Sequence, residues 1–190
     1  IRNFHLPYLK AFKERGYEVW VAAGSSGEVP YADHVVELPF YKRFFCLQNL
    51  HAVFKARALL KRERFDILSA HTTLAGAVSR AAVLLLLRRP KVFYTCHGYL
   101  FSEHQGLLKW IYLLPEKICS LVTDVLMTMN EEDYELARRH HLSRGQLCSI
   151  DGMGIAYDRY APLSPEERAD RRLKAGTQEQ EVLFIYAAEF

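Results

Sequence analysis

The stretch FDILSAHTTLAGAVSRAAVLLLLRRPKVFYTCHG, residues 65–98, decides the fold class. Its two ends, FDILSAH (65–71) and VFYTCHG (92–98), are short apolar runs, and the segment between them is rich in alanine and leucine. Two such runs joined by a helix are typical of a parallel β-α-β unit. We therefore expect one strand ending at His71, a helix over 73–87, and a second strand ending at His97-Gly98.

The same alternation of apolar runs and helical segments continues on both sides of this stretch. It predicts an α/β protein with a Rossmann-like parallel sheet and helices on both faces. In the helix 47–64, Leu50, Val53, Phe54 and Leu60 are expected on the apolar side. The other expected helices are 1–15, 106–121 and 131–141, and the other expected strands are 17–24, 34–40, 124–130 and 146–150.

Both ends of the sequence depart from this alternation. The chain opens on a helix, whereas a unit of this kind normally starts with a strand, so the first strand is expected to be missing. Near the other end comes the charged helix SPEERADRRLKAG, with Ser164 as N-cap and Pro165 at its first position. The run EVLFIYAAEF (181–190) then begins an apolar strand. We expect one domain over 1–162, and over 163–190 the start of a second, truncated domain.

Composition excludes several classes of protein. Half of the 190 residues are hydrophobic and a quarter are charged, which excludes disorder over most of the chain. The net charge is only +3, a smaller positive excess than a dedicated nucleic-acid-binding protein usually has. The four cysteines form no CxxC pair, and we interpret them as reduced thiols of a cytosolic protein. The apolar run 81–87 is far shorter than the roughly 20 residues of a membrane span.

The residues that follow the strands are the candidates for ligand binding. In open parallel sheets, ligands bind beyond the carboxyl ends of the strands, and the N-termini of the following helices favour an anionic group there. The chain has no P-loop, no GxGxxG after a strand and no GxSxG elbow. On the residues alone, the sequence predicts an α/β domain that binds a small anionic ligand. The strand-end segments are 24–26, 71–73, 97–99, 130–132 and 151–154.

Six segments in fixed order carry a family resemblance. They are IRNFHLPYLKAFKERGYEVWVAAG, SAHTTLAGAVSRAA, VFYTCHGYLF, MTMNEEDYELARRH, DGMGIAYDRY and EVLFIYAAEF. Together they resemble the N-terminal half of a family 4 glycosyltransferase, and within it the bacterial enzymes that build capsule or exopolysaccharide repeat units. The resemblance implies the GT-B architecture, in which two Rossmann-like domains face each other across a cleft. It also implies sugar transfer from a nucleotide-diphosphate donor with retention of configuration.

The resemblance further implies which part of such an enzyme is present. The chain corresponds to the acceptor-side domain and the beginning of the donor-side domain. The glycine-rich loop of the family would precede Ile1, and the basic pair and glutamates that serve the donor would follow Phe190. We therefore expect the fragment to be inactive by itself.

The resemblance also implies roles for the strand-end residues. His97 is the expected catalytic residue, facing the donor sugar, where a neutral imidazole can hydrogen-bond a hydroxyl or stabilise developing charge. These residues also have structural alternatives. His97 could be a buried histidine that caps the edge of the sheet, Thr72, Thr73 or Asn130 could cap the following helix, and the glycines could form turns. The other six histidines are interpreted as solvated or structural. The expected substrate-binding residues are His71, Thr72, Gly98, Asn130, Glu131, Gly152 and Gly154.

The expected ligands follow from the same resemblance. No His, Cys or Asp cluster has metal-ligand spacing, and the family generally needs no bound metal, so we expect no resident cofactor. The nucleotide-diphosphate sugar is a co-substrate, held mainly by the missing domain. The acceptor is a saccharide or a polyprenyl-linked saccharide, and no nucleic acid is expected.

A basic segment suggests a further partner. From Lys42 to Arg64 the chain has seven basic residues and one acid, beside Tyr41, Phe44 and Phe45. An anionic membrane attracts such a segment by about 1 kcal/mol per basic side chain. The hypothesis is peripheral docking of a cytoplasmic enzyme to the inner leaflet, and the alternative is a solvated helix face. The membrane-facing residues are Lys42, Arg43, Lys55, Arg57, Lys61, Arg62 and Arg64.

Two other classes of function stay open. A sugar-nucleotide epimerase of GT-B fold would share the layout without transferring sugar, and it should carry a carboxylate acid/base pair at the strand ends. A non-enzymatic α/β binding module should be complete in one domain.

Overall fold

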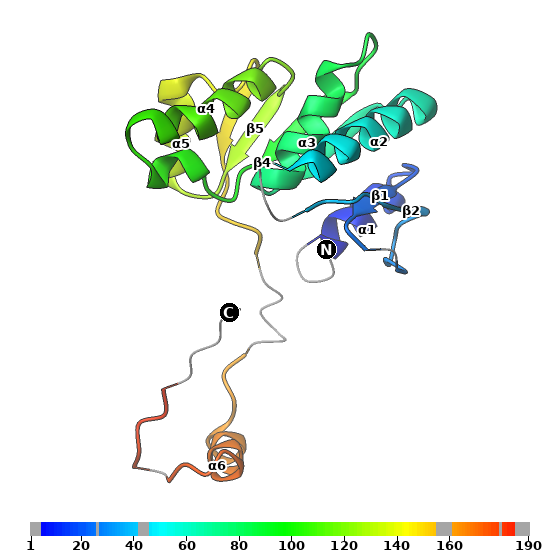
Figure 1. Ribbon diagram of the computed structural model, residues 1–190. Coiled ribbons are helices and arrows are strands. Elements are labelled where there is room, and N and C mark those ends of the chain that lie inside the picture. The colour runs from blue at the N-terminus through cyan, green and yellow to red at the C-terminus, as the bar shows by residue number, and fades with distance from the viewer. Residues whose placement is uncertain (1–4, 26, 42–45, 155–160, 179, 185–190) are drawn as a thin grey trace. The chain divides into compact units, whose positions relative to one another are not determined.

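The computed structural model describes residues 5–25, 27–41, 46–154, 161–178 and 180–184 (Figure 1). It divides the chain into two units, Ile1–Gly154 and Ile155–Phe190, and each is described here by itself.

The first unit contains two parallel ladders among its described residues. The larger one has four strands in the order β3-β4-β5-β6, and the smaller one pairs β1 with β2. The α/β class with parallel sheets flanked by helices is therefore confirmed, although the described strands form two sheets and not one. The strands are β1 (Trp20–Ala23), β2 (His34–Glu37), β3 (Ile67–His71), β4 (Lys91–Thr95), β5 (Val125–Thr128) and β6 (Gln146–Ser149).

Five α-helices and a 3-10 turn accompany the described strands of this unit, and the first helix precedes β1. The five α-helices lie within a few residues of their expected ranges, and α3 stops at Leu84, three residues before the expected end. The 3-10 turn was not predicted from the sequence. Gly16, which has φ of +80°, follows the first helix as a C-terminal glycine should. The elements are α1 (Leu6–Glu14), α2 (Leu47–Glu63), α3 (Thr73–Leu84), η1 (Leu100–Glu103), α4 (Gly106–Ser120) and α5 (Glu131–His140).

The expected apolar side of α2 was partly wrong. Leu50 and Phe54 are about half exposed, whereas Ala52 and Ala56 are buried. Small side chains let α2 approach α3 closely, and the two helices share many contacts. The buried face of α2 therefore combines the expected Leu60 with small side chains that hydropathy alone did not identify.

Close packing of α3 on β4 organises the core. The Tyr94 ring is fully buried, and a Cβ atom added to Gly76 would lie 2.4 Å from it. The Arg80 guanidinium lies 3.7 Å from the centre of the same ring, and its Nη2 donates to Glu116 Oε2 of α4 at 2.9 Å. Because Arg80 and Glu116 are both buried, the pair ties α3, β4 and α4 together at a place that water does not reach.

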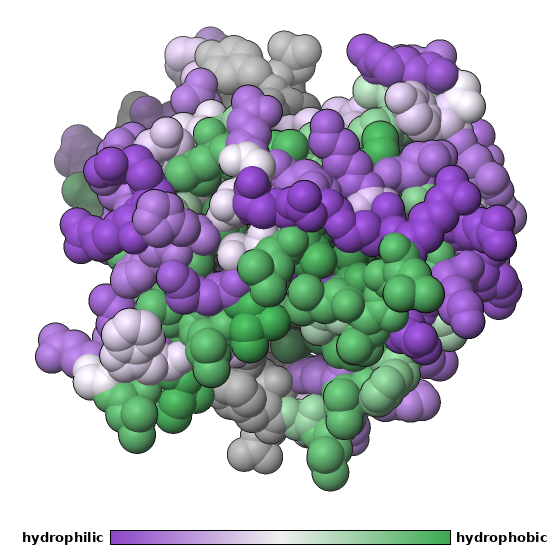
Figure 2. Space-filling view, turned by 90° about the horizontal axis from the view of Figure 1, so that it is seen from above, coloured by the Kyte–Doolittle hydropathy of each residue, from purple (hydrophilic) through white to green (hydrophobic). Residues whose placement is uncertain are grey.

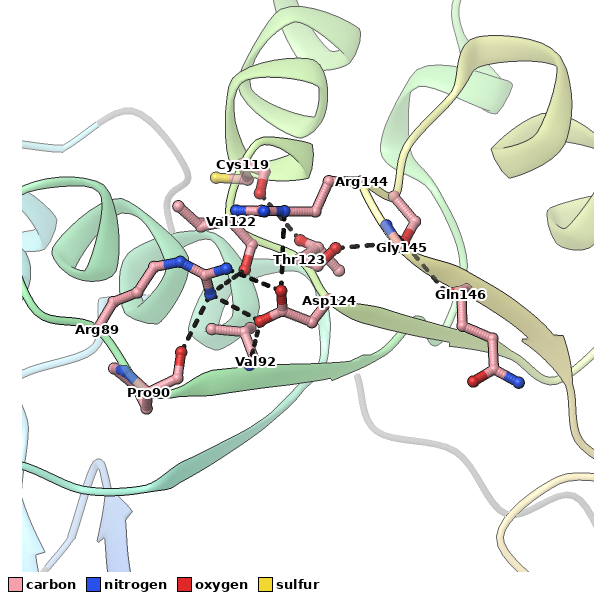
Figure 3. Close-up of polar contacts among 11 residues, drawn as sticks. Arg89, Pro90, Val92, Cys119, Val122, Thr123, Asp124, Arg144, Gly145 and Gln146 are labelled. Carbon is pink, nitrogen blue, oxygen red and sulfur yellow. Dashed lines mark hydrogen bonds and ion pairs between the residues drawn. The ribbon is translucent and has the colours of Figure 1, made fainter.

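A second ion pair fixes the amino-terminal ends of the central strands (Figure 3). Arg89 donates two hydrogen bonds to the Asp124 carboxylate, at 2.6 and 2.8 Å, and the Val92 amide donates a third at 2.8 Å. These bonds lower the pKa of Asp124 to about 2. The backbone amide of Gln146 donates to the Asp124 carbonyl, so the starts of β4, β5 and β6 meet at this residue.

The described part of the second unit is a helix with short segments before and after it. The helix α6 (Pro165–Lys174) begins as expected, and Ser164 and Glu167 form a capping box. Residues 181–184 are not in a strand, and the rest of the expected strand, 185–190, lies outside the described residues.

The cysteines and the helix lengths also bear on predictions made from the sequence. The four cysteines are free thiols, and Cys96 and Cys119 are buried. Among the described residues, every helix is too short or too polar to cross a bilayer.

Candidate functional site

The carboxyl ends of the four central strands lie side by side. Register places His71, Thr95, Met127 and Cys148 in one row across β3, β4, β5 and β6. Neighbouring strands are about 4.8 Å apart, so the segments that follow this row share one edge of the sheet. All strand-end candidates of these four strands therefore lie along this edge.

Three imidazole rings gather at the β3 end of the edge. The His71 ring centre lies 6.1 Å from that of His97 and 4.4 Å from that of His5. Ser69 Oγ is 3.1 Å from His71 Nε2. The Nδ1 atom of His71 is buried and has no hydrogen-bond partner in the part of the chain that the structure describes. A buried nitrogen without a partner is a polar atom that a ligand hydroxyl can satisfy.

The pKa values of both central histidines are lowered. Burial, and after it the neighbouring His5 and His97 rings, lowers the pKa of His71 to about 4. Burial also lowers the pKa of His97. A neutral imidazole offers one donor and one acceptor, which suits hydrogen bonds to sugar hydroxyls.

The two histidine loops are joined to each other. Thr73 Oγ1, at the start of α3, donates to the Gly98 carbonyl at 3.1 Å. Gly98 has φ of +107°, a conformation that favours glycine. The bond holds the loop after β3 against the loop after β4, so the two rings keep their spacing.

Thr72 lies between these loops in a rare backbone conformation. Its φ of +65° and ψ of 158° are in a region that is otherwise nearly exclusive to glycine. Its side chain makes no capping bond, so the structural alternative of a helix cap by Thr72 is wrong. Strain of this kind is stored at functional sites, which keeps Thr72 among the candidates.

Asn130 is occupied as a helix cap. Its Oδ1 accepts from the Asp133 amide at 2.7 Å, and its Nδ2 donates to the Asp133 carboxylate at 2.7 Å. The structural alternative for Asn130 is therefore confirmed. Glu131 is exposed at the first position of α5, on the same edge.

Gly152 and Gly154 follow β6 with φ of +94° and +71°. Both conformations favour glycine, so the two residues shape the turn that leaves the sheet. The structure places them on the same edge as the histidines, at its far end. Their contact with a ligand remains a prediction.

The basic segment lies elsewhere, on α2 and at its end. Arg57 Nε donates to the Leu85 carbonyl at 3.1 Å, and Arg62 pairs with Glu63. Arg64 ends the helix in the left-handed conformation. Lys55 and Lys61 are exposed, and Lys42 and Arg43 lie outside the described residues.

Sequence reasoning missed one residue of the site and one bond within it. His5 was interpreted as solvated or structural, yet it packs on His71, and the hydroxyl of Thr73 links the two loops. No local pattern identifies a contact between residues 5 and 71, because it depends on long-range packing. In the described part of the chain, no group of three or more His, Cys, Asp or Glu side chains is placed to hold a metal.

Comparison with known proteins identifies the family. Residues 8–150 match the family described as Glycosyltransferase Family 4. The chain is 36% identical over 190 residues to the "Putative glycosyltransferase EpsD" of Bacillus subtilis (strain 168), covering 99% of this chain and 50% of that protein. It is 33% identical over 103 residues to the O-antigen biosynthesis glycosyltransferase WbnH of Escherichia coli, covering 54% of this chain and 29% of that one.

Two further comparisons concern a named activity and the fold. An Escherichia coli UDP-Gal:alpha-D-GlcNAc-diphosphoundecaprenol alpha-1,3-galactosyltransferase is 26% identical over 117 residues, covering 61% of this chain and 30% of that enzyme. A sucrose-phosphate synthase from Thermosynechococcus elongatus has a TM-score of 0.54 at 13% identity, covering 91% of this chain and 94% of that chain, and so shares the fold. The chain spans half or less of the length of these curated relatives. The matched segment covers most of the described strands and helices, and the chain belongs to Glycosyltransferase Family 4.

Proposed function

We propose that the whole enzyme transfers a sugar from a nucleotide-diphosphate donor to a saccharide or polyprenyl-linked acceptor in surface polysaccharide synthesis. The observation that carries the proposal is the pair of imidazoles, His71 and His97, which the Thr73–Gly98 bond holds at the carboxyl edge of the sheet. The names of the relatives, which include O-antigen glycosyltransferases and an enzyme acting on a diphosphoundecaprenol-linked sugar, support this class of acceptor.

The two histidines have different roles in this proposal. His97 contacts the donor sugar and hydrogen-bonds a hydroxyl, and its neutral ring stabilises the positive charge that develops at the anomeric carbon. His71 offers its unpartnered Nδ1 to an acceptor hydroxyl. Thr72, Gly98, Glu131, Gly152 and Gly154 shape the same edge, and Asn130 acts through the cap of α5.

Retention of configuration is part of the proposal. The acceptor hydroxyl attacks the face that the diphosphate leaves, and the leaving phosphate takes its proton, so no protein base is required. The family resemblance also implies no resident metal, and we expect activity to persist in EDTA. The anomeric proton coupling of the product reports the stereochemical outcome.

The experiment uses the longest natural protein that contains this sequence. It is incubated with UDP-galactose, UDP-glucose, UDP-N-acetylglucosamine or GDP-mannose, and with N-acetylglucosaminyl-diphosphoundecaprenol as acceptor. His97→Ala is expected to lower kcat by about 100-fold or more, the loss typical of one electrostatic contact in the transition state. His51→Ala is the matched control, because His51 is exposed on α2.

Two results would contradict the proposal. Isomerised sugar nucleotide released without acceptor would indicate an epimerase. Full activity of His97→Ala would show that His97 takes no part in the reaction.

We also propose that the enzyme acts in the cytoplasm, peripherally on the inner leaflet. The support is the basic segment, of which Lys55, Lys61 and Arg64 are exposed. Replacing these three by glutamate should weaken co-sedimentation with anionic vesicles about tenfold or more, since each contributes about 1 kcal/mol. Unchanged binding would exclude this segment as the contact.

A further inference from the structure

A pocket opens at the amino-terminal ends of β3 and β4. It has a volume of about 360 Å³ and lies between the last turns of α2 and the loop 85–90, which joins α3 to β4. Small-molecule sites in proteins start at about this size. The candidate functional site is at the other ends of the same strands, roughly 15 Å away along a strand of five residues. One small ligand therefore cannot occupy both places.

Five cationic side chains line this pocket, and none of the described residues that line it is Asp or Glu. Two of the five have partners within the protein. Arg57 Nε donates to the Leu85 carbonyl at 3.1 Å, and Arg89 donates to the Asp124 carboxylate (Figure 3). These contacts fix the two ends of the loop 85–90, so Arg57 and Arg89 have a structural role.

The other three cations have no partner of this kind. Lys61, Arg64 and Arg88 are exposed, and in the part of the chain that the structure describes their side chains make no hydrogen bond or ion pair. The adjacent acids Glu63 and Asp66 do not line the pocket. Like charges that gather without a counter-ion repel one another, and an anion between them removes this repulsion. The pocket therefore has three positive charges available for a ligand.

The structural alternative is that these cations balance the ends of helices. Basic residues near a helix C-terminus interact favourably with its dipole, and the effect falls off within the last turn. It accounts for Lys61 in the last turn of α2 and for Arg64 at its C-cap. The helix α3 ends at Leu84, so Arg88 lies four residues beyond it and outside this range. The position of Arg88 therefore favours a ligand site over a set of helix-end charges.

Apolar side chains form the rest of the lining. Leu60 and Pro90 are buried, and Phe65 and Leu86 are partly buried, whereas the three available cations are exposed. The end of α2 lies at the right of Figure 1, and in the view from above hydrophilic side chains, drawn in purple, gather on that side (Figure 2). An apolar lining with a few charged groups is typical of a site for an organic ligand.

We propose that this pocket is a second ligand site, which binds a soluble organic diphosphate of the nucleoside diphosphate class. A diphosphate carries two or more negative charges at neutral pH, which matches the three available cations. The guanidinium groups of Arg64 and Arg88 bind phosphate oxygens from the two walls of the pocket, and Lys61 adds a point charge. The organic part lies against the apolar lining. The proposal does not depend on the transfer reaction, because the pocket is at the ends of the strands away from the histidines.

The test titrates the full chain with UDP, UMP, uridine and sulfate by isothermal titration calorimetry. An ionic strength of about 0.15 M screens weak attraction to exposed charges. We expect saturable binding of UDP, about tenfold weaker binding of UMP and of sulfate, and no binding of uridine. Inorganic pyrophosphate should compete with UDP, because both present a diphosphate group. In Arg64→Ser/Arg88→Ser the affinity for UDP should fall about tenfold or more, the usual loss when charge-assisted hydrogen bonds are removed.

The matched control is Lys55→Ser/Arg139→Ser. It also removes two exposed cations, but neither lines the pocket, so UDP should bind as it does to the unaltered chain. Circular dichroism checks the fold of each variant. If the double variant of the pocket does not fold, Arg88→Ser alone replaces it, because Arg88 is exposed in a loop. Arg88→Ser should also leave co-sedimentation with phosphatidylglycerol vesicles unchanged, because the ligand is a soluble anion and not a lipid headgroup.

Four results would overturn the proposal. The first is the absence of saturable UDP binding. The second is UDP binding that Arg64→Ser/Arg88→Ser leaves unchanged or that the control variant weakens equally. The third is equal binding of sulfate, UMP and UDP, which would indicate general attraction of anions. The fourth is loss of vesicle binding in Arg88→Ser, which would indicate that the pocket takes a lipid headgroup.

Discussion

At the scale of single residues, the backbone of Thr72 is the most unusual feature of the candidate site. Residues with a Cβ atom pay strain of about 1–3 kcal/mol in this region of φ and ψ. We expect Thr72→Gly to be more stable than Thr72→Ala by about 1 kcal/mol, as judged by urea denaturation. At ordinary positions within helices and strands, an alanine variant is more stable than a glycine variant. If Thr72→Ala were as stable as Thr72→Gly or more stable, the strained conformation of Thr72 would be contradicted.

The lowered pKa of His71 predicts a pH dependence of stability. The unfolded chain binds a proton near the ordinary pKa of 6.5, whereas the folded chain resists protonation until about 4. The unfolded state therefore binds more protons between these values, and stability falls as the pH falls through this window. His71→Gln removes this contribution, and its free energy of unfolding should decline less than that of the unaltered chain between pH 6.5 and 4. Parallel pH profiles of the two proteins would contradict the assignment.

Sequence reasoning found some residues of the site and missed others for a physical reason. His71 and His97 could be found because parallel strands bring their carboxyl ends to one edge. The contact of His5 with His71 and the bond from Thr73 to Gly98 could not, since each joins segments that are distant in sequence. The helix cap by Asn130 could be proposed from the sequence as an alternative, because it is a local contact with the backbone three residues further along.

At the scale of elements, Gly76 controls how closely α3 approaches β4. Alanine would gain helix propensity, but its Cβ atom would lie 2.4 Å from the Tyr94 ring, which Arg80 holds in place. We expect Gly76→Ala to lower the free energy of unfolding by about 1–3 kcal/mol, the usual cost of overpacking. Chemical denaturation measures the change.

The control for this prediction is Gly24→Ala. A Cβ atom at Gly24 would meet nothing within 4 Å, and the residue has no positive φ. It should change stability by less than about 0.5 kcal/mol. Equal losses at the two positions would mean that general effects of alanine, and not contact with Tyr94, determine the result.

The helices show that hydropathy predicts where a helix begins and ends better than it predicts which face is buried. Their approximate bounds followed from apolar spacing, because periodicity and caps are local. The inward face of α2 did not, since close approach to α3 buries Ala52 and Ala56 and leaves Leu50 and Phe54 exposed. Strand order was beyond the same reasoning, because pairing of β1 with β2 apart from β3–β6 is a long-range property.

At the scale of the whole molecule, the buried hydrophobic residues described by the structure all belong to the first unit, from Val19 to Leu142. The helix α6 buries none of its residues, and its capping box and the Lys174–Asp170 pair are local contacts. Burial of apolar surface is the main source of folding free energy. The first unit should therefore carry the stability of the chain.

This distribution predicts the outcome of a truncation. Residues 1–154 alone should unfold cooperatively, with a thermal midpoint within about 3 °C of that of the full chain, because a change of 1 kcal/mol in a protein of this size moves the midpoint by about 2–4 °C. Differential scanning calorimetry of the two chains, with Gly76→Ala in each, provides the comparison. The Gly76→Ala substitution should lower both midpoints equally, since Gly76 packs within the first unit. A truncated chain that melts much earlier, or without a cooperative transition, would show that residues 155–190 contribute to the core.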